Sequence, residues 1–288
     1  MRKTLVLFFI LYTSFSFGQQ ISPKLDDSFL LAETKQVGQF FRRFNSEEDF
    51  DGKRISPRDT LYHNPRLRKF YISNAFDDFN QGMDDDLKTK FIKDVVDKNP
   101  QLLDFHSGNW FAQVNAMFEY KGKLETGVLF LTLERENKGY KWVLSNIYFH
   151  PFVELFNKDE NVAWNGKKYG EPKIKKYIHP KSHEMHFINL KSALNDTNVL
   201  QDYIENQHRP DFLTLFVFEM KRKELSLQSI QEVKFHFFQI DNWYFELKEL
   251  RRSSKNSGWL ISDMAHVTEK DKNLLKQYIF MKKNEMIP

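Results

Sequence analysis

Residues 110–120 read WFAQVNAMFEY, and this stretch decides the fold. Every second side chain is apolar, at positions 110, 112, 114, 116, 118 and 120, whereas the intervening positions include Gln113, Asn115 and Glu119. Because successive side chains of a β-strand point to opposite faces of a sheet, the alternation predicts a long strand with one wholly apolar face.

Two more strands are expected directly after this one. The residues Lys121-Gly122-Lys123 form a turn, and residues 124–134 are rich in the Val, Leu, Phe and Thr that favour strands. A second turn at Asn137-Lys138-Gly139 leads to a third strand, residues 140–149. The three segments predict an antiparallel meander.

Helices are expected before the meander. Apolar residues recur at spacings of three and four in residues 27–44, and with partial helical spacing in 67–79 and 87–96, where Asn99-Pro100 stops the third helix. The polar residues 45–65 between them are expected to form a loop. Helices followed by a meander indicate an α+β fold, and not the alternating order of a dinucleotide-binding sheet.

The second half of the chain repeats this order. Residues 150–180 lack a clear period and are interpreted as a connection, and residues 187–204 are helical in composition. Four strands are then expected at 212–220, 233–240, 243–250 and 259–267, followed by a basic amphipathic helix at 269–283.

A short internal repeat supports two similar domains. The sequence WVLSNI, residues 142–147, matches WLISDM, residues 259–264, and each follows a glycine-containing turn. A unit that recurs at this distance predicts a tandem duplication, with a first domain at 25–150, a linker at 151–184 and a second domain at 185–288. Chance similarity of two strands is the alternative.

On these residues each half resembles the cone-shaped α+β family of nuclear transport factor 2 and ketosteroid isomerase. The resemblance rests on the last strands, which begin near Trp142 and Trp259. It implies helices packed on a bent antiparallel sheet with a pocket between them. It does not imply catalysis, because this fold hosts enzymes, ligand binders and interaction modules. The second half has a shortened helical region, which makes a full pocket there less expected.

The amino terminus predicts export. Arg2 and Lys3 precede the apolar run 5–12, and small residues flank a cleavage site near Gly18, so residues 1–18 are expected to be a signal peptide. The end of this leader resembles those of secreted Bacteroidetes proteins. The mature chain is expected to be periplasmic or secreted, with no transmembrane segment. With no cysteine after the cleavage point, a lipoprotein anchor is not expected.

The charge balance and the absence of cysteine exclude several classes of partner and cofactor. Without the leader the chain has 41 basic and 39 acidic residues, so no nucleic-acid partner is expected. The absence of cysteine excludes thiolate zinc sites and iron–sulfur clusters. No cofactor is predicted. His179, His183 and His186 lie close together, but their spacing fits no known ligand frame, so a solvated linker is preferred and no metal site is predicted.

Five residues are candidates for binding a ligand. Gln113, Asn115 and Glu119 lie on the mixed face of the first long strand, where amides can orient a bound molecule without ionising. His236 and His266, together with Asp263, could form an acid and base pair in a pocket. The alternatives are a solvated face for the first set and satisfied core histidines for the second.

Three functions remain open on the sequence. The first is an exported non-catalytic binding or interaction protein, for a small ligand or an envelope protein partner. The second is an enzyme of the isomerase, dehydratase or hydrolase kind with a site in the first domain, although no nucleophile elbow, phosphate loop or metalloprotease motif is present. The third is a structural subunit of an envelope assembly, with the basic terminal helix docking to an acidic partner.

Overall fold

The computed structural model describes residues 36–137, 139–157, 211–253 and 256–281, with short pieces at 177–178, 182, 190–195 and 203. The expected signal peptide and the three clustered histidines of the linker lie outside these residues. Among the helices of the described residues, none is long and apolar enough to cross a membrane.

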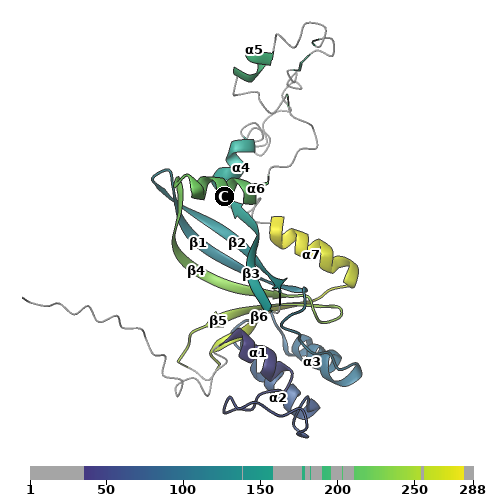
Figure 1. The fold of residues 1–288 in the computed structure, drawn as a ribbon. Coiled ribbons are helices and arrows are strands. Elements are labelled where there is room, and N and C mark those ends of the chain that lie inside the picture. The colour runs from purple at the N-terminus through teal and green to yellow at the C-terminus, as the bar shows by residue number, and fades with distance from the viewer. Residues whose placement is uncertain are drawn as a thin grey trace, which may run out of the picture.

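One six-stranded antiparallel sheet organises the fold, in the order β3-β2-β1-β4-β5-β6 (Figure 1). The α+β class is therefore confirmed. The two expected meanders are present, but they do not form separate sheets, because β1 and β4 pair along their lengths from Trp110↔Phe237 to Tyr120↔Leu225. The strands are β1 Trp110–Tyr120, β2 Lys123–Glu136, β3 Gly139–Phe149, β4 Leu225–Phe237, β5 Trp243–Leu250 and β6 Gly258–His266.

Helices cover both ends of this sheet. Local signals start several of them: the side chain of Asn64 caps α2 ahead of Pro65, and that of Asp84 caps α3. The described helices are α1 Val37–Phe44, α2 Pro65–Asn74, α3 Asp85–Lys93, which continues into a π-helical turn at Asp94–Lys98, α4 His150–Asn157, α5 Leu190–Asn195, α6 Phe212–Lys221 and α7 Glu269–Met281.

Three expectations for the second half are corrected. Residues 212–220, expected as a strand, form helix α6, whose cap is Asp211: its Oδ1 accepts from the backbone N–H of Leu213 at 3.0 Å and of Thr214 at 3.2 Å. Helix α4 occupies the start of the expected connection. Strand β4 begins at Leu225, eight residues before the expected start at 233.

The apolar face of the sheet packs against two groups of helices. At one end Trp110 and Phe237 contact α1 through Phe41, at ring distances of 4.8 and 5.4 Å. At the other end Phe118 contacts Phe216 of α6 at 5.9 Å. The even positions of β1 that the sequence assigned to one face therefore supply both clusters.

The opposite face is covered only in part by the described helices. Phe280 of α7 packs on Phe111 and Phe130 at 4.7 and 4.8 Å, so this helix covers the β1 and β2 side. The Lys272 ammonium holds the start of α7 to the β4–β5 turn by donating to the carbonyl oxygens of Phe238 and Ile240. Polar side chains from β4, β5 and β6 occupy the rest of this face.

Strand β4 has one incompletely paired side. Its pairing with β5 is confined to Lys234–Phe237, and β5 then runs away from it (Figure 1). Residues 225–231 pair only with β1 within the described part of the chain. We refer to these seven residues as the open β4 edge.

Candidate functional site

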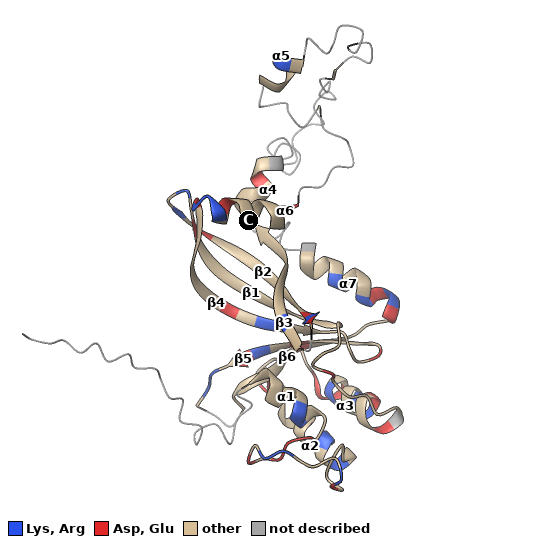
Figure 2. Ribbon diagram, in the orientation of Figure 1, with Lys and Arg blue, Asp and Glu red and all other residues tan. Residues whose placement is uncertain are grey.

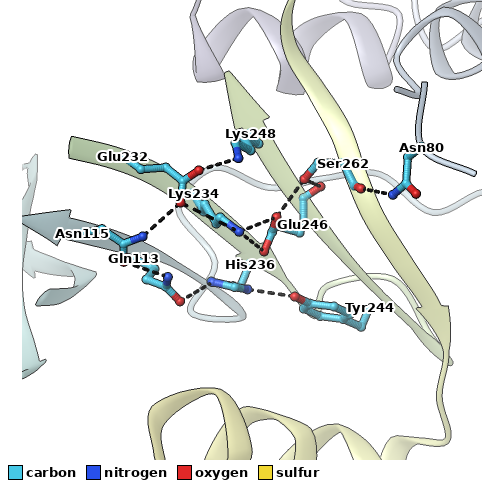
Figure 3. A network of polar contacts seen from close by, with 10 residues as sticks. All are labelled: Asn80, Gln113, Asn115, Glu232, Lys234, His236, Tyr244, Glu246, Lys248 and Ser262. Atoms are coloured by element: carbon cyan, nitrogen blue, oxygen red, sulfur yellow. Dashed lines mark hydrogen bonds and ion pairs between the residues drawn. The ribbon is translucent and has the colours of Figure 1, made fainter. Parts of the chain in front are cut away.

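Three of the residues singled out in the sequence meet at the centre of the sheet (Figure 3). Gln113 and Asn115 lie on β1 and His236 lies on the neighbouring β4, and all three project from the same face. Gln113 and His236 are buried. Because β1 and β4 come from different halves of the chain, this arrangement depends on the single continuous sheet.

These side chains form a hydrogen-bonded chain with one direction. A carboxylate only accepts, so the Asn115 Nδ2 donates to Glu232 Oε2 at 2.9 Å and the Asn115 Oδ1 accepts from Gln113 Nε2 at 3.2 Å. Gln113 Oε1 then accepts from His236 Nε2 at 3.2 Å, which leaves His236 Nδ1 to accept from the Tyr244 hydroxyl at 2.9 Å. The acceptor Gln113 Oε1 therefore requires a proton on His236 Nε2, and the imidazole with its proton there and its Nδ1 free to accept satisfies both contacts.

Ion pairs extend this chain across β4, β5 and β6. Lys248 binds the Oε1 of Glu232, and Lys234 binds Glu246 at 3.2 Å. The Ser262 hydroxyl donates to Glu246 Oε1 at 2.8 Å. Opposite charges on neighbouring strands stabilise a sheet face, and here they hold β4 to β5 where the two strands separate. Figure 2 shows that the charged residues of β4 lie only in the half that approaches β5.

Burial and nearby negative charge raise the pKa values of two groups on this face, the Tyr244 hydroxyl and the Asp263 carboxyl. Burial raises the pKa of the Tyr244 hydroxyl well above its usual value, and the carboxylates of Glu246 and Asp263 add to the effect. Burial also raises the pKa of Asp263, and Glu246, which lies directly opposite on β5, raises it further. The Tyr244 hydroxyl therefore stays a donor to His236 at physiological pH.

We predict that Tyr244→Phe destabilises the protein by about 1–3 kcal/mol, because it leaves the buried His236 Nδ1 without its donor. Urea unfolding followed by circular dichroism measures the loss. Tyr148→Phe is the matched control, since Tyr148 is also buried but its hydroxyl has no hydrogen bond to any of the described residues. Equal losses in the two variants would contradict the directed chain.

Asp263→Asn is expected to stabilise the protein by about 0.2–1 kcal/mol at neutral pH, because it removes a like charge opposite Glu246. A carboxyl whose folded pKa is raised binds its proton more tightly when folded, so its cost appears as the pH rises above 3.8 and vanishes below it. The gain should therefore disappear in acid. Unfolding curves at several pH values test this, with the exposed Asp241→Asn as control; a gain that persists in acid would refute the cause.

Glu119 and His266, the other two candidates from the sequence, lie apart from these hydrogen-bonded side chains. Glu119 accepts from the Gln228 amide at 3.2 Å, at the far end of β1. His266 packs on Trp243 at 5.0 Å, whereas His236 bonds Tyr244. Neighbouring residues of a strand point to opposite faces, so the two histidines lie on opposite sides of the sheet and the expected acid and base pair does not form.

The polar side chains of this face form a network in which they bond to one another. The amides, the imidazole and the carboxylates bond to one another, and within the described residues no group of three or more His, Asp or Glu side chains could hold a metal ion. Satisfied buried networks give rigidity and a unique arrangement. The network fixes how β1, β4 and β5 lie, and so fixes the open β4 edge.

The open β4 edge is an exposed surface whose outer backbone groups pair with no other strand of the described residues. Leu227 and Ile230 are 45% and 60% exposed, and they lie opposite Phe118 and Ala116, on the face that α6 packs against. Val217, Phe218 and Met220 of α6 are also exposed. The stretch 225–231, LSLQSIQ, has neither a charge nor a proline. Natural edge strands are usually protected by such residues or by β-bulges, and in this stretch β4 has only the bulges, at the two places where its register against β1 shifts.

Sequence reasoning missed this surface for two reasons. The start of β4 alternates weakly, with Leu225 and Leu227 followed by a bulge, so no strand was expected there. The α6 segment was interpreted as a strand because of its aromatic and branched residues. The capping residue Asp211 was the signal that could have found the helix.

Comparison with protein-family models, with curated proteins and with solved structures finds no match to this chain. The resemblance to the nuclear transport factor 2 family therefore stays a prediction.

Proposed function

We propose that this protein is an exported, non-catalytic interaction protein that joins a partner polypeptide by adding a strand of the partner to the open β4 edge. The export follows from the expected signal peptide. The observation that supports the binding mode is that, within the described residues, no strand lies along the outer side of residues 225–231, so their backbone N–H and C=O groups are available there, with two β-bulges where β4 shifts register against β1.

The side chains beside this edge suit an extended polypeptide. An incoming strand would gain main-chain hydrogen bonds, and its alternate side chains would cover Leu227 and Ile230, which are exposed without a partner element in the described chain. An exposed apolar group at a strand edge that has neither a charge nor a proline favours association with another chain. A small polar ligand is less well supported, because the amides of Gln113 and Asn115 already bond to protein groups.

Selection of short random peptides displayed on phage tests this function. We expect the purified protein to enrich peptides with alternating apolar residues, and Ile230→Lys to lose their binding because it places a charge on the edge. Leu124→Lys is the matched control, since Leu124 is equally apolar and exposed but lies on β2. No enrichment, or equal binding by the two variants, would overturn the proposal.

A further inference from the structure

We propose that the strand added to the open β4 edge is the same strand of a second copy of this chain, paired antiparallel to it. This inference rests on the proposed function and names its partner. Two copies would then be related by a two-fold axis near Gln228, and their two six-stranded sheets would join into one.

The available length of edge suits this pairing. The free stretch of β4 is bounded at one end by the turn at Lys223, which has a φ of 63°, and at the other by Glu232, which Lys248 of β5 binds two residues before the β5 pairing begins at Lys234. In an antiparallel pair about Gln228, residues 225–231 of each copy lie along residues 231–225 of the other. Each copy therefore fills the place beside β4 that its neighbour's β5 leaves empty.

Two copies of the open β4 edge can lie side by side without bringing like charges together. Residues 225–231 consist of leucine, isoleucine, serine and glutamine, so no like charges meet when the strand pairs with its own copy. The first charged residue after this stretch, Glu232, is held by Lys248 and by the Asn115 amide of its own chain. A two-fold contact requires this kind of self-complementary surface.

Helix α6 supplies the apolar part of the contact. Within one chain α6 lies near the start of β4, where Phe216 packs on Phe118 and the backbone N–H of Lys121 donates to Glu224 O at 2.9 Å. Ile230 lies toward the other end of the edge and is 60% exposed. Antiparallel pairing brings the α6 of the second copy to that end, so its exposed Val217 and Phe218 can cover Ile230.

The chain already uses the same geometry internally. Strands β1 and β4 each begin a meander, and they pair antiparallel to join the two meanders into one sheet. The pairing of two β4 strands would repeat this joint between chains. It would also cover a strand edge without charge or proline, which otherwise favours uncontrolled association.

The absence of native cysteine makes disulfide trapping a direct test. We expect Gln228→Cys in the full protein to give a disulfide-linked dimer under mild oxidation, because Gln228 faces its own copy in this pairing, and we expect less dimer from Leu227→Cys and Ser229→Cys, because each of these positions faces the other. Antiparallel strands bring facing Cα atoms within disulfide range. Ser73→Cys, on the exposed side of α2, is the control and should give at most a small fraction of dimer.

Light scattering distinguishes pairing with a second copy from binding of a different polypeptide at the same edge. We expect a dimeric mass for the unmodified protein, a monomeric mass for Ile230→Lys with unchanged circular dichroism, and a dimeric mass for Leu124→Lys. A monomeric unmodified protein that gives no preferential disulfide but binds phage peptides at the edge would overturn the second copy and leave the proposed function standing. If Ile230→Lys changes neither the mass nor peptide binding, the proposed function itself fails.

Discussion

Trp110→Ala should lower the free energy of unfolding by about 3–5 kcal/mol, the usual cost of truncating a large buried aromatic side chain. The Trp110 side chain is 2% exposed. Its ring contacts Phe41 of α1 at 4.8 Å, Phe237 of β4 at 5.4 Å and Trp142 of β3 at 5.2 Å. One side chain thus packs against elements of both halves of the chain.

The physical reason for so large an effect is that the cavity cannot close. The surrounding rings belong to different elements, and the indole Nε1 also donates to the Phe105 carbonyl at 2.9 Å, which truncation leaves without its donor. Denaturant unfolding followed by circular dichroism measures the loss. Trp142→Ala is the control, because Trp142 is 38% exposed at the rim of the same cluster and should cost much less. Similar losses would contradict the central place of Trp110.

Arg68→Met is the second large effect, with an expected loss of about 2–4 kcal/mol, the sum of two buried carbonyl groups losing a charged donor. Arg68 is 1% exposed, and its Nε donates to Phe44 O at 3.1 Å while its Nη2 donates to Gln101 O. These bonds tie the end of α1 to the segment that precedes β1.

No ion pair of the Arg68 guanidinium with a carboxylate is seen among the described residues. Burial alone lowers the pKa of Arg68 to about 10, so the group remains charged at neutral pH and its bonds keep their strength. Arg66→Met, on the exposed side of the same helix, is the control and should change the stability by less than about 0.5 kcal/mol. A small loss for Arg68→Met would show that methionine packing compensates for the lost bonds.

The strands of the fold could be predicted wherever alternation and turns agree. Strand β1 has the expected bounds Trp110–Tyr120, and β5 the expected bounds Trp243–Leu250. The turns between β1, β2 and β3 also lie where glycine and asparagine indicated, with Lys121 and Gly122 at positive φ. These features depend on residues that are neighbours in the sequence, so the sequence alone predicts them.

The pairing of β1 with β4 could not be predicted in the same way. It joins residues more than a hundred positions apart, and neither strand specifies its neighbour by its own pattern. Helix α6 was mistaken for a strand because its aromatic and β-branched residues favour strands, while tertiary packing and the Asp211 cap favour a helix.

In the candidate site, too, the local features could be predicted and the long-range contacts could not. Gln113 and Asn115 lie on the mixed face of β1 that the alternation indicated, but their bonds to His236 and Glu232 were not predicted, because these two partners come from β4. Their role as a closed network depends on Glu232 and Tyr244, which had no distinguishing sequence signal. The open β4 edge depends on where β5 ends relative to β4, and only the assembled sheet determines that.

Hydrogen exchange along β4, compared between dilute and concentrated protein, tests the addition of a strand at the open edge most directly. We expect the amides of residues 225–231 that point away from β1 to exchange quickly in dilute protein and slowly in concentrated protein. Amides of Lys234–Phe237, which β5 already covers, should exchange equally slowly in both. Equally fast exchange of the open β4 edge at every concentration would show that no strand of a second copy is added there.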